Sequence, residues 1–244
     1  PASASAAGRP WPLPSNSFKL GSSLTLVQLS SVAIAGRKTF LPPAALRRVA
    51  ASRLVLERAM AAGGTIYGVN TGFGELASTR ISHERLAQVQ RNLVLSHACG
   101  IGEPLDVLEA RSILFLRVNE LSRGFSGVRP ALVRHLARML DKNIIPLIPS
   151  RGSVGASGDL APQAHMAMAV IGEGDVLYRG RRMTAAAALK RAGLKPFVLA
   201  EKEGLALLNG TQAMQSVGGL ALLVAERVYR ASNLACAASL DALT

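Results

Sequence analysis

The chain has 244 residues, of which 49% are apolar and 18% are charged, a composition that provides for a folded core and argues against large-scale disorder. The formal charge of +13 comes from basic residues scattered along the chain, and only 4% of the residues are aromatic. That distribution argues against a base-stacking surface, and we predict no nucleic-acid partner.

The predicted elements are mainly α-helical, with a few small strands near the N-terminus. Residues 1–20 are rich in Pro, Ala and Ser and lack periodicity, so we expect a disordered tail there. An alternating stretch between Leu24 and Ile34 favours the small strands. Apolar periodicity and capping residues then predict helices over about 43–61, 83–97, 104–122, 129–141 and 160–171.

Two glycine-rich segments separate these helices and are predicted to be loops. Residues 63–74 have the sequence GGTIYGVNTGFG, and residues 145–159 have the sequence IPLIPSRGSVGASGD. Arg179-Gly180 lies between two short runs that predict a hairpin. From residue 203 the chain is helical in character up to Thr244, where it stops inside an apolar, Ala-rich stretch without a cap. We therefore expect a fragment of a longer protein.

Signals for secretion and for membrane insertion are not visible in the sequence. The start has no charged segment followed by an apolar run, and the most apolar stretch, 204–225, is interrupted by polar residues. The two cysteines, Cys99 and Cys236, make no disulfide framework. These features favour a cytoplasmic protein without a membrane partner.

The segment GSVGASGDLAP, residues 152–162, is the strongest candidate for chemistry. A flexible loop followed by a helix capped by Ser157 or Asp159 would account for its composition alone. A serine nucleophile elbow requires the pattern G-x-S-x-G, and the last position is Asp159 rather than glycine. That nucleophile is therefore not predicted.

Backbone cyclisation is a third interpretation of the same segment. The amide nitrogen of Gly158 can attack the carbonyl carbon of Ala156, because glycine lacks a Cβ and permits a bent backbone. Loss of water closes an imidazolone ring, and dehydration of the Ser157 side chain leaves an exocyclic methylidene. The product, 4-methylideneimidazole-5-one, is an electrophile of a kind that unmodified side chains do not provide. Elimination of ammonia from an amino acid needs such a group, because the amino group is a poor leaving group.

This segment resembles the signature of the aromatic amino acid lyases, which include histidine, phenylalanine and tyrosine ammonia-lyases. His165 follows as the signature requires, whereas Gln163 departs from the Leu that is more often found there. The resemblance covers nearly everything after about Ser22. It extends through YGVNTGFG (67–74), QRNLVLSHACGIGEPL (90–105), RVNELSRGFSGVRP (117–130) and GLALLNGTQAM (204–214).

The resemblance implies roles for particular residues. Ala156, Ser157 and Gly158 would form the 4-methylideneimidazole-5-one (MIO) group autocatalytically. Asn209 would contact that group and help to form or hold it, and its amide can stabilise negative charge on the ring oxygen. Tyr67 would act as a general base or proton shuttle, which requires neighbours that lower its pKa from the usual value of ~10.

The pair Ser96-His97 occupies the position that sets substrate selectivity in the family. On the residues alone, His97 would be a hydrogen-bonded core histidine, because it continues a helical stripe of Leu86, Val89 and Leu93. The resemblance instead makes Ser-His typical of histidine lyases, whereas tyrosine lyases have His-Leu and phenylalanine lyases have Phe-Leu. A buried imidazole that pairs with a polar substrate ring should discriminate against an apolar ring.

Neither a metal nor a nucleotide is predicted. His83, His135 and His165 share no metal-ligand spacing. Residues 72–77 fit the dinucleotide pattern G-x-G-x-x-G/A but lack the βαβ context that gives this pattern its meaning.

The resemblance implies a mainly α fold, a helical bundle of the aromatic amino acid lyase (fumarase/aspartase-like) type. Residues 21–202 would form the N-terminal region with the active-site loops, and 203–244 would begin the central bundle. The implied activity is elimination of ammonia from L-histidine, an amino acid substrate, to give trans-urocanate, in a protein that is a homotetramer at full length. The alternatives are a tyrosine or phenylalanine ammonia-lyase, an aminomutase of the same family, or an incomplete fragment that serves only in assembly.

Overall fold

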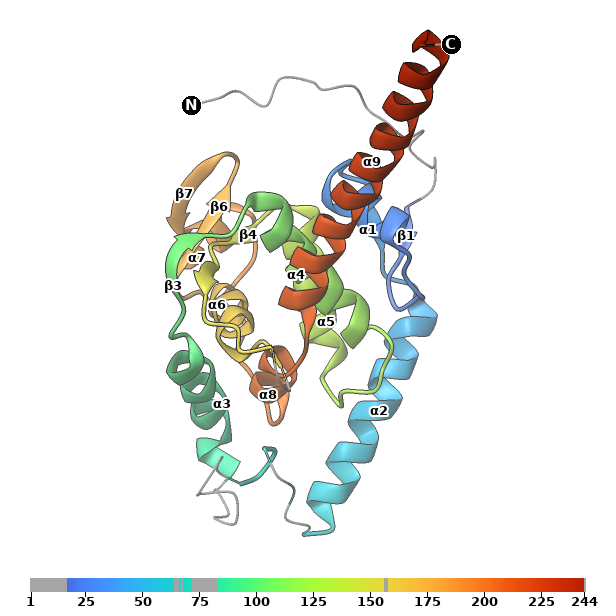
Figure 1. Cartoon of the computed structure of the whole chain (residues 1–244). Coiled ribbons are helices and arrows are strands. Elements are labelled where there is room, and N and C mark those ends of the chain that lie inside the picture. The colour runs from blue at the N-terminus through green and yellow to red at the C-terminus, as the bar shows by residue number, and fades with distance from the viewer. Residues whose placement is uncertain (1–16, 64–65, 67, 72–82, 156–157, 244) are drawn as a thin grey trace.

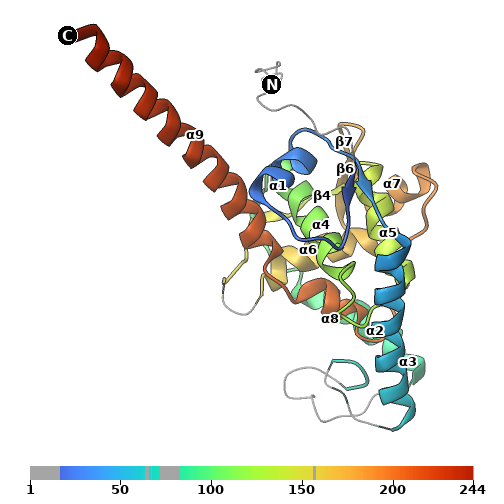
Figure 2. The ribbon, with the colours of Figure 1, turned by 90° about the vertical axis from the view of Figure 1, so that its right-hand side faces the viewer.

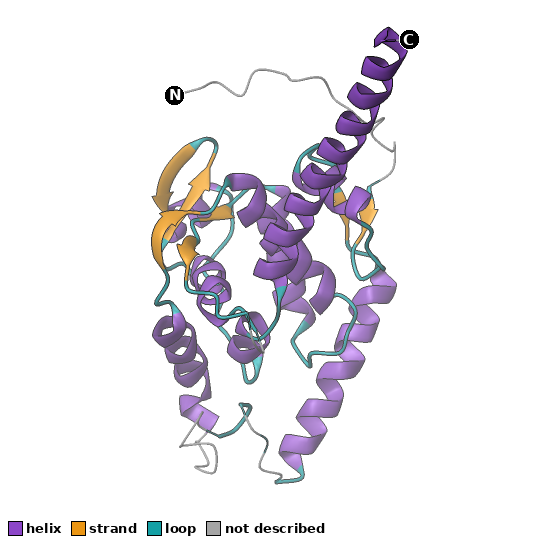
Figure 3. Ribbon diagram, in the orientation of Figure 1, coloured by secondary structure: helices purple, strands orange, loops and turns teal. Residues whose placement is uncertain are grey.

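The structure, a computed structural model, describes residues 17–63, 66, 68–71, 83–155 and 158–243, and it is mainly helical (Figures 1 and 3). The described helices are α1 (Leu26–Ala33), α2 (Pro43–Ala61), α3 (His83–His97), α4 (Val107–Leu121), α5 (Pro130–Asp141), α6 (Leu160–Val170), α7 (Ala185–Arg191), α8 (Glu203–Leu208) and α9 (Gln212–Leu243). The described strands are β1 (Phe18–Lys19), β2 (Thr39–Phe40), β3 (Ile101–Pro104), β4 (Ile145–Pro146), β5 (Pro149–Arg151), β6 (Asp175–Tyr178) and β7 (Arg181–Thr184). The predicted mainly α fold class is thereby confirmed.

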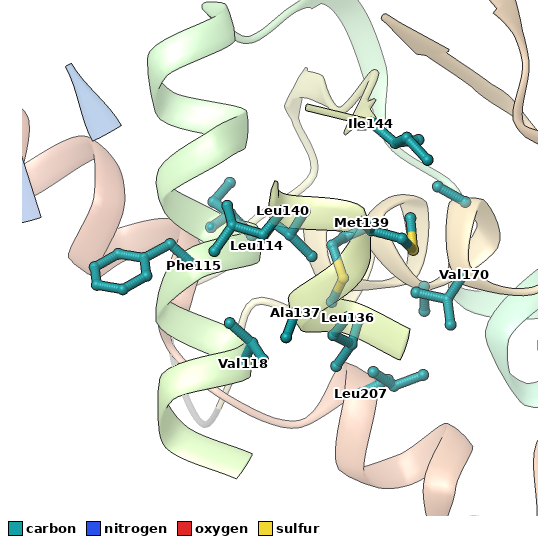
Figure 4. Close-up of a cluster of buried hydrophobic side chains, with 14 of the residues drawn as sticks. Leu114, Phe115, Val118, Leu136, Ala137, Met139, Leu140, Ile144, Val170 and Leu207 are labelled. Atoms are coloured by element: carbon teal, nitrogen blue, oxygen red, sulfur yellow. The ribbon is translucent and has the colours of Figure 1, made fainter. Parts of the chain in front are cut away.

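The core is organised around α4, which is buried on nearly all sides. A helix that is covered all round needs neighbours on every face, and α4 packs against α1, α5 and α9. Figure 4 shows Leu114 and Val118 of α4 among side chains of α5, with Leu207 of α8 and Val170 of α6 nearby. Each of these apolar side chains contributes ~1.5–3 kcal/mol on burial. The core therefore holds α6 and α8 in place beside each other.

The three small sheets lie at the periphery of this core. β1 pairs in parallel with β2, β3 pairs with β5, and β6 joins β4 to β7 in an antiparallel sheet. The hairpin predicted around Arg179-Gly180 is present, with both residues at positive φ. The pairing of β3 with β5 matters most, because it ties the end of α3 to the start of the loop that follows β5.

The strands predicted between Leu24 and Ile34 are wrong, because this stretch forms α1. Thr25 caps the helix, and its hydroxyl accepts from the amide of Gln28 while the Gln28 side chain accepts from the amide of Thr25. This reciprocal capping stabilises a helix start. The apolar residues that α1 buries are Leu29, Val32 and Ala33, at helical spacing.

The tail predicted over residues 1–20 extends too far. Phe18 and Leu20 are buried, and the Phe18 ring packs edge-on against Phe115 at 5.2 Å between ring centres. Residues 1–16 lie outside the described part of the chain. The helices predicted over 43–61, 83–97, 129–141 and 160–171 agree with α2, α3, α5 and α6, whereas the one over 104–122 begins later, at Val107, after β3.

The last helix, α9, leaves the body of the molecule and projects away from it (Figure 2). Its buried residues are Gln212, Ala213, Ser216 and Leu223, all in the first half of its 32 residues. Beyond them it exposes large apolar side chains, including Val228, Leu234 and Leu240. None of the described helices combines the length and the hydropathy that a membrane span requires.

Candidate active site

Gly158 lies directly against the turn that joins α8 to α9. A Cβ atom placed on Gly158 would lie 3.0 Å from Oδ1 of Asn209 and 3.2 Å from the amide nitrogen of Gly210. The next residue, Asp159, donates its amide to the carbonyl of Gly210 at 2.7 Å. The structure thus brings together Gly158 and Asn209, which were both predicted as site residues, and it leaves no comfortable room for a side chain at position 158.

Asp159 anchors this contact from inside the protein. Its side chain is fully buried, accepts from the hydroxyl of Ser153 and accepts from the amide of Met214 at 2.9 Å. Met214 lies in the first turn of α9, where unpaired amides and the helix dipole favour a carboxylate. One interpretation of the sequence had α6 capped by Ser157 or Asp159. Asp159 does occupy the N-cap position of α6, but its side chain makes no capping bond there and caps α9 instead.

The start of the loop is fixed to the chain that follows α3. A Cβ on Gly152 would lie 3.1 Å from both the Cα of Gly100 and the Cβ of Ala161. The amide of Gly100 donates to Nε2 of His165 on α6 at 3.1 Å. Burial lowers the pKa of His165, which favours the neutral ring that this bond requires. The segment after His97 is therefore packed against the beginning of the loop and against α6.

His97 lies at the last residue of α3 in a defined tautomer. Its Nδ1 is 2.8 Å from the carbonyl of Leu93, and a carbonyl only accepts, so Nδ1 carries the proton. The Ser96 hydroxyl lies 3.2 Å from the same nitrogen. Nε2 is left for other partners. His97 is half-buried and Ser96 is exposed in this chain, so the predicted buried imidazole is only partly covered here.

Gln90, which the sequence reasoning missed, connects the first glycine-rich loop to α8. Its fully buried side chain donates weakly to the carbonyl of Gly68 at 3.4 Å and accepts from the amide of Gly204 at 2.8 Å. A Cβ on Gly204 would lie 2.7 Å from the carbonyl oxygen of Gln90, so the two helices approach closely. The sequence did contain a pattern that singles out Gln90, because it is a polar residue on the apolar face of α3, between Leu86 and Leu93.

Arg117 of α4 is a second residue that the sequence reasoning missed. It is 1% exposed, and its Nη1 donates to the backbone carbonyl of Asn209 at 3.3 Å and to Glu120 at 3.2 Å. Burial lowers the pKa of Arg117. A charged residue between the apolar run 113–116 and Val118 was the available signal.

Three predicted site residues, Tyr67, Ala156 and Ser157, lie outside the described residues, and their predicted roles remain predictions. Among the residues that the structure does describe, no three His, Cys, Asp or Glu side chains are grouped as metal ligands would be. A cavity of about 380 Å³ adjoins the loop and is lined in part by Ser150, Ser153, Met214 and Val217. A larger groove, of about 630 Å³, lies away from it beside α2 and residues 123–127.

The fold and this site define a helical protein whose glycine-lined loop is held between the starts of two helices and an asparagine turn. The chain belongs to the aromatic amino acid lyase family: the family model of that description matches residues 24–244. The resemblance inferred from the motifs is thereby confirmed.

Curated relatives are named histidine ammonia-lyase. The relative from Stigmatella aurantiaca is 51% identical over 91% of this chain and 44% of its own length. The relative from Bacillus subtilis (strain 168) is 46% identical over 88% of this chain and 42% of its own length. The chain thus spans less than half the length of these relatives.

Solved structures of related proteins share the fold. A histidine ammonia-lyase from Trypanosoma cruzi matches with a TM-score of 0.81 at 36% identity, over 88% of this chain and 42% of its own. A phenylalanine aminomutase from Pantoea agglomerans matches with a TM-score of 0.84 at 32% identity, over 88% of this chain and 42% of its own. Similarity of fold therefore does not separate lyases from aminomutases.

Proposed function

We propose that this chain supplies the loop and part of the substrate pocket of a histidine ammonia-lyase, which converts L-histidine to trans-urocanate and ammonia. The observation that carries the proposal is the contact of Gly158 with Asn209 and Gly210, which fits a glycine whose amide nitrogen joins a ring. The names of curated relatives at about half identity support the choice of histidine as substrate. The aminomutases and phenylalanine lyases among the solved structures are 27–38% identical, a range that includes the solved histidine ammonia-lyase at 36%, so the choice of histidine rests on the curated relatives.

The residues around Gly158 fit an MIO group derived from Ala156, Ser157 and Gly158. Such a group, once formed, supplies the electrophile that the reaction needs. Asn209 offers an amide beside Gly158, which can stabilise charge on the ring oxygen, and the buried Asp159 fixes the backbone after the ring. The proposal includes neither a metal nor a nucleotide.

Tyr67 is proposed as the base that removes the proton next to the ring of the substrate. Its neighbour Gly68 is attached through Gln90 to the start of α8, the helix that ends at Asn209. This connection between Gly68 and the helix that ends at Asn209 supports the proposal that Tyr67 and Asn209 act at one site. A well-placed base contributes roughly 10²–10⁴ in rate.

Ser96 and His97 are proposed to select the imidazole ring of the substrate. Because Nδ1 of His97 donates to Leu93, Nε2 is the nitrogen that can pair with a polar edge of the substrate. Substrates without that edge, such as phenylalanine, leave the pair unsatisfied and bind poorly.

The activity is tested by joining these 244 residues to the C-terminal part of the Stigmatella aurantiaca relative and following urocanate by absorbance with L-histidine. We expect urocanate from the fused protein and none when Ser157 is replaced by alanine. Turnover of phenylalanine or tyrosine but not histidine, or a β-amino acid product, would contradict the proposal. The intact mass of the 244-residue chain is a separate check, because ring formation removes two waters.

The whole protein is further proposed to be a cytoplasmic homotetramer. The apolar side chains that α9 exposes support association with further copies, because contiguous exposed apolar surface marks interaction sites. An assembly unit without activity is the alternative, and the absence of turnover in the fused protein would favour it.

A further inference from the structure

Arg117 is buried at a cost that packing alone does not explain. The side chain is 1% exposed, and its Nε and Nη2 have no hydrogen-bond partner among the described residues. Burial of a cation costs several kcal/mol unless it is paired. An apolar side chain of similar volume at this point of α4 would fill the same space without that cost.

The guanidinium lies against the turn that carries Asn209. Nη1 donates to the carbonyl of Asn209 at 3.3 Å, and a Cβ on Gly210 would lie 2.3 Å from Nη2 and 2.8 Å from Nη1. The carbonyl of Gly210 in turn accepts the amide of Asp159 at 2.7 Å. A continuous set of contacts thus runs from Arg117 through the turn to the residue after Gly158.

Two carboxylates balance the charge at this point. Glu120, one turn further along α4, accepts from Nη1 at 3.2 Å, and the buried Asp159 attracts the guanidinium electrostatically. The cation is therefore held between its own helix and the loop. Its Nη1 bridges Glu120 and the Asn209 carbonyl, so movement of the turn would break a bond inside a low-dielectric site.

We propose that Arg117 is a positioning residue that clamps the Asn209-Gly210 turn. The clamped turn keeps the backbone of Gly158 in the bent geometry that ring closure requires. Arg117 acts on Gly158 indirectly, by fixing the position of the turn. The role in ring closure depends on the proposed function, whereas the clamp itself does not.

Hydrogen–deuterium exchange of the 244-residue chain tests the clamp directly. We compare the natural chain with Arg117→Met, which keeps the length but loses the donors, and with Arg117→Lys, which restores one donor. Arg111→Met is the matched control, because Arg111 is a partly buried arginine on the same helix that bonds to Val32 and Leu140 instead of the turn.

We expect exchange in residues 208–214 and 158–160 to be about tenfold faster in Arg117→Met, the effect of losing one buried hydrogen bond, and Arg117→Lys to reverse part of this. Exchange in α5 should be unchanged, and Arg111→Met should leave the turn protected. Unchanged exchange of the turn in Arg117→Met would overturn the proposal. So would an equal increase throughout the chain in both Arg117 variants and in Arg111→Met, because Arg117 would then serve only the fold.

The intact mass of the same samples separates this inference from the proposed function. A natural chain that lacks two waters, with the loss reduced in Arg117→Met and partly restored in Arg117→Lys, supports the role of the clamp in ring closure. Full water loss in Arg117→Met would overturn that role. If the natural chain keeps both waters, the proposed ring fails in this chain, while the exchange data still decide whether Arg117 holds the turn.

Discussion

Buried polar side chains, rather than exposed ones, hold the parts of the candidate site together. Gln90, Arg117 and Asp159 are each at most 1% exposed, and each bonds to backbone of a loop or of another helix. Buried polar groups are costly unless they are satisfied, so their bonds restrict the arrangement of the loops more sharply than apolar contacts do. Single substitutions of residues at the candidate site should show which hydrogen bonds contribute most to stability or to activity.

Replacement of Asp159 should reduce stability in proportion to the bonds lost. Asp159→Asn keeps an acceptor for the Met214 amide but loses the charge at the start of α9, and we expect a loss of about 1–2 kcal/mol. Asp159→Leu leaves both Met214 and Ser153 unpaired, and we expect about twice that loss. Urea unfolding measures both. Asp175→Asn, at an exposed ion pair with Arg182, is the control and should change stability by less than about 1 kcal/mol.

Asn209→Ala should affect chemistry more than folding. If the amide stabilises charge on the ring oxygen, its loss should lower kcat by about 10²–10³ in the active fused protein. The side chain is exposed and its backbone carbonyl still accepts from Arg117, so the midpoint of thermal unfolding should shift little. A kcat within about threefold of the natural value would exclude the assigned role.

Among the residues of the candidate site that the structure describes, the family resemblance predicted Gly158 and Asn209 but neither Gln90 nor Arg117. Gly158 and Asn209 each lie in a matched segment, and the structure places them in contact. Gln90 and Arg117 lie in matched segments too, yet nothing in the sequence says which backbone a long polar side chain reaches. For Asp159 the sequence offered only a cap of its own helix, by Ser157 or Asp159, as one interpretation, because local capping is visible in sequence and capping of a distant helix is not.

At the scale of elements, the site depends on how closely helices and loops approach one another. Glycines mark these approaches: Gly204 meets α3, Gly210 meets Arg117, and Gly152 meets Gly100. Each would force a neighbour to move if it carried a side chain. The short strands β3 and β5 add a second constraint, since they fix the loop relative to the end of α3.

Two glycine substitutions on either side of the start of α9 should act in opposite directions. Gly210→Ala places a methyl group within 2.3 Å of the Arg117 guanidinium and of the Gln212 side chain, and we expect a loss of about 1–3 kcal/mol. Gly218 lies inside α9 with no described residue within 4 Å of an added Cβ, and we expect Gly218→Ala to gain about 0.5–1 kcal/mol from helix propensity. Thermal unfolding of both variants measures these changes in stability. Equal effects of the same sign would contradict the assigned crowding at Gly210.

Helices with long apolar periodicity were predicted with useful accuracy, and short elements were not. The periods of α3 and α5 span several turns, so pattern and structure agree. α1 has only 8 residues, and its alternating apolar positions imitate a strand until the reciprocal cap of Thr25 and Gln28 is considered. β3, β4 and β5 owe their conformation to partners distant in sequence, which no local window contains.

For the molecule as a whole, the pH dependence of stability follows from a buried histidine of α5, and self-association follows from the exposed surface of α9. α5 presents His135 to the interior beside Phe197, at 5.3 Å between ring centres, and Nε2 of His135 has no partner among the described residues. α9, in contrast, exposes apolar side chains away from the core.

Stability should fall as the solution is acidified below neutral pH. Burial and the nearby Arg138 lower the pKa of His135 from 6.5 to about 4. The unfolded chain therefore binds a proton between those values while the folded chain does not, and folding loses up to about 3 kcal/mol as pH falls from 6.5 to 4. His135→Leu should flatten this part of a urea-derived stability curve. Burial also lowers the pKa of His165, so a smaller slope of the same sign should remain.

The exposed face of α9 should drive self-association of the chain. We expect light scattering to give a mass above that of a monomer at micromolar concentration, and Val228→Glu with Leu234→Glu to restore the monomer, because charges are excluded from apolar interfaces. Asn233→Glu, an exposed position on another face of the same helix, is the control for charge alone. A natural chain that stays monomeric at every concentration would exclude α9 as an association surface.

The manner in which α9 is anchored has a mechanical consequence. A helix of 32 residues is a rod about 48 Å long. Its inner end is bonded through Met214 to Asp159, the residue after Gly158, and its outer end extends away from the body of the molecule. We therefore expect a partner bound at the outer end to fix the tilt of the whole rod, and with it the position of the turn at Asn209.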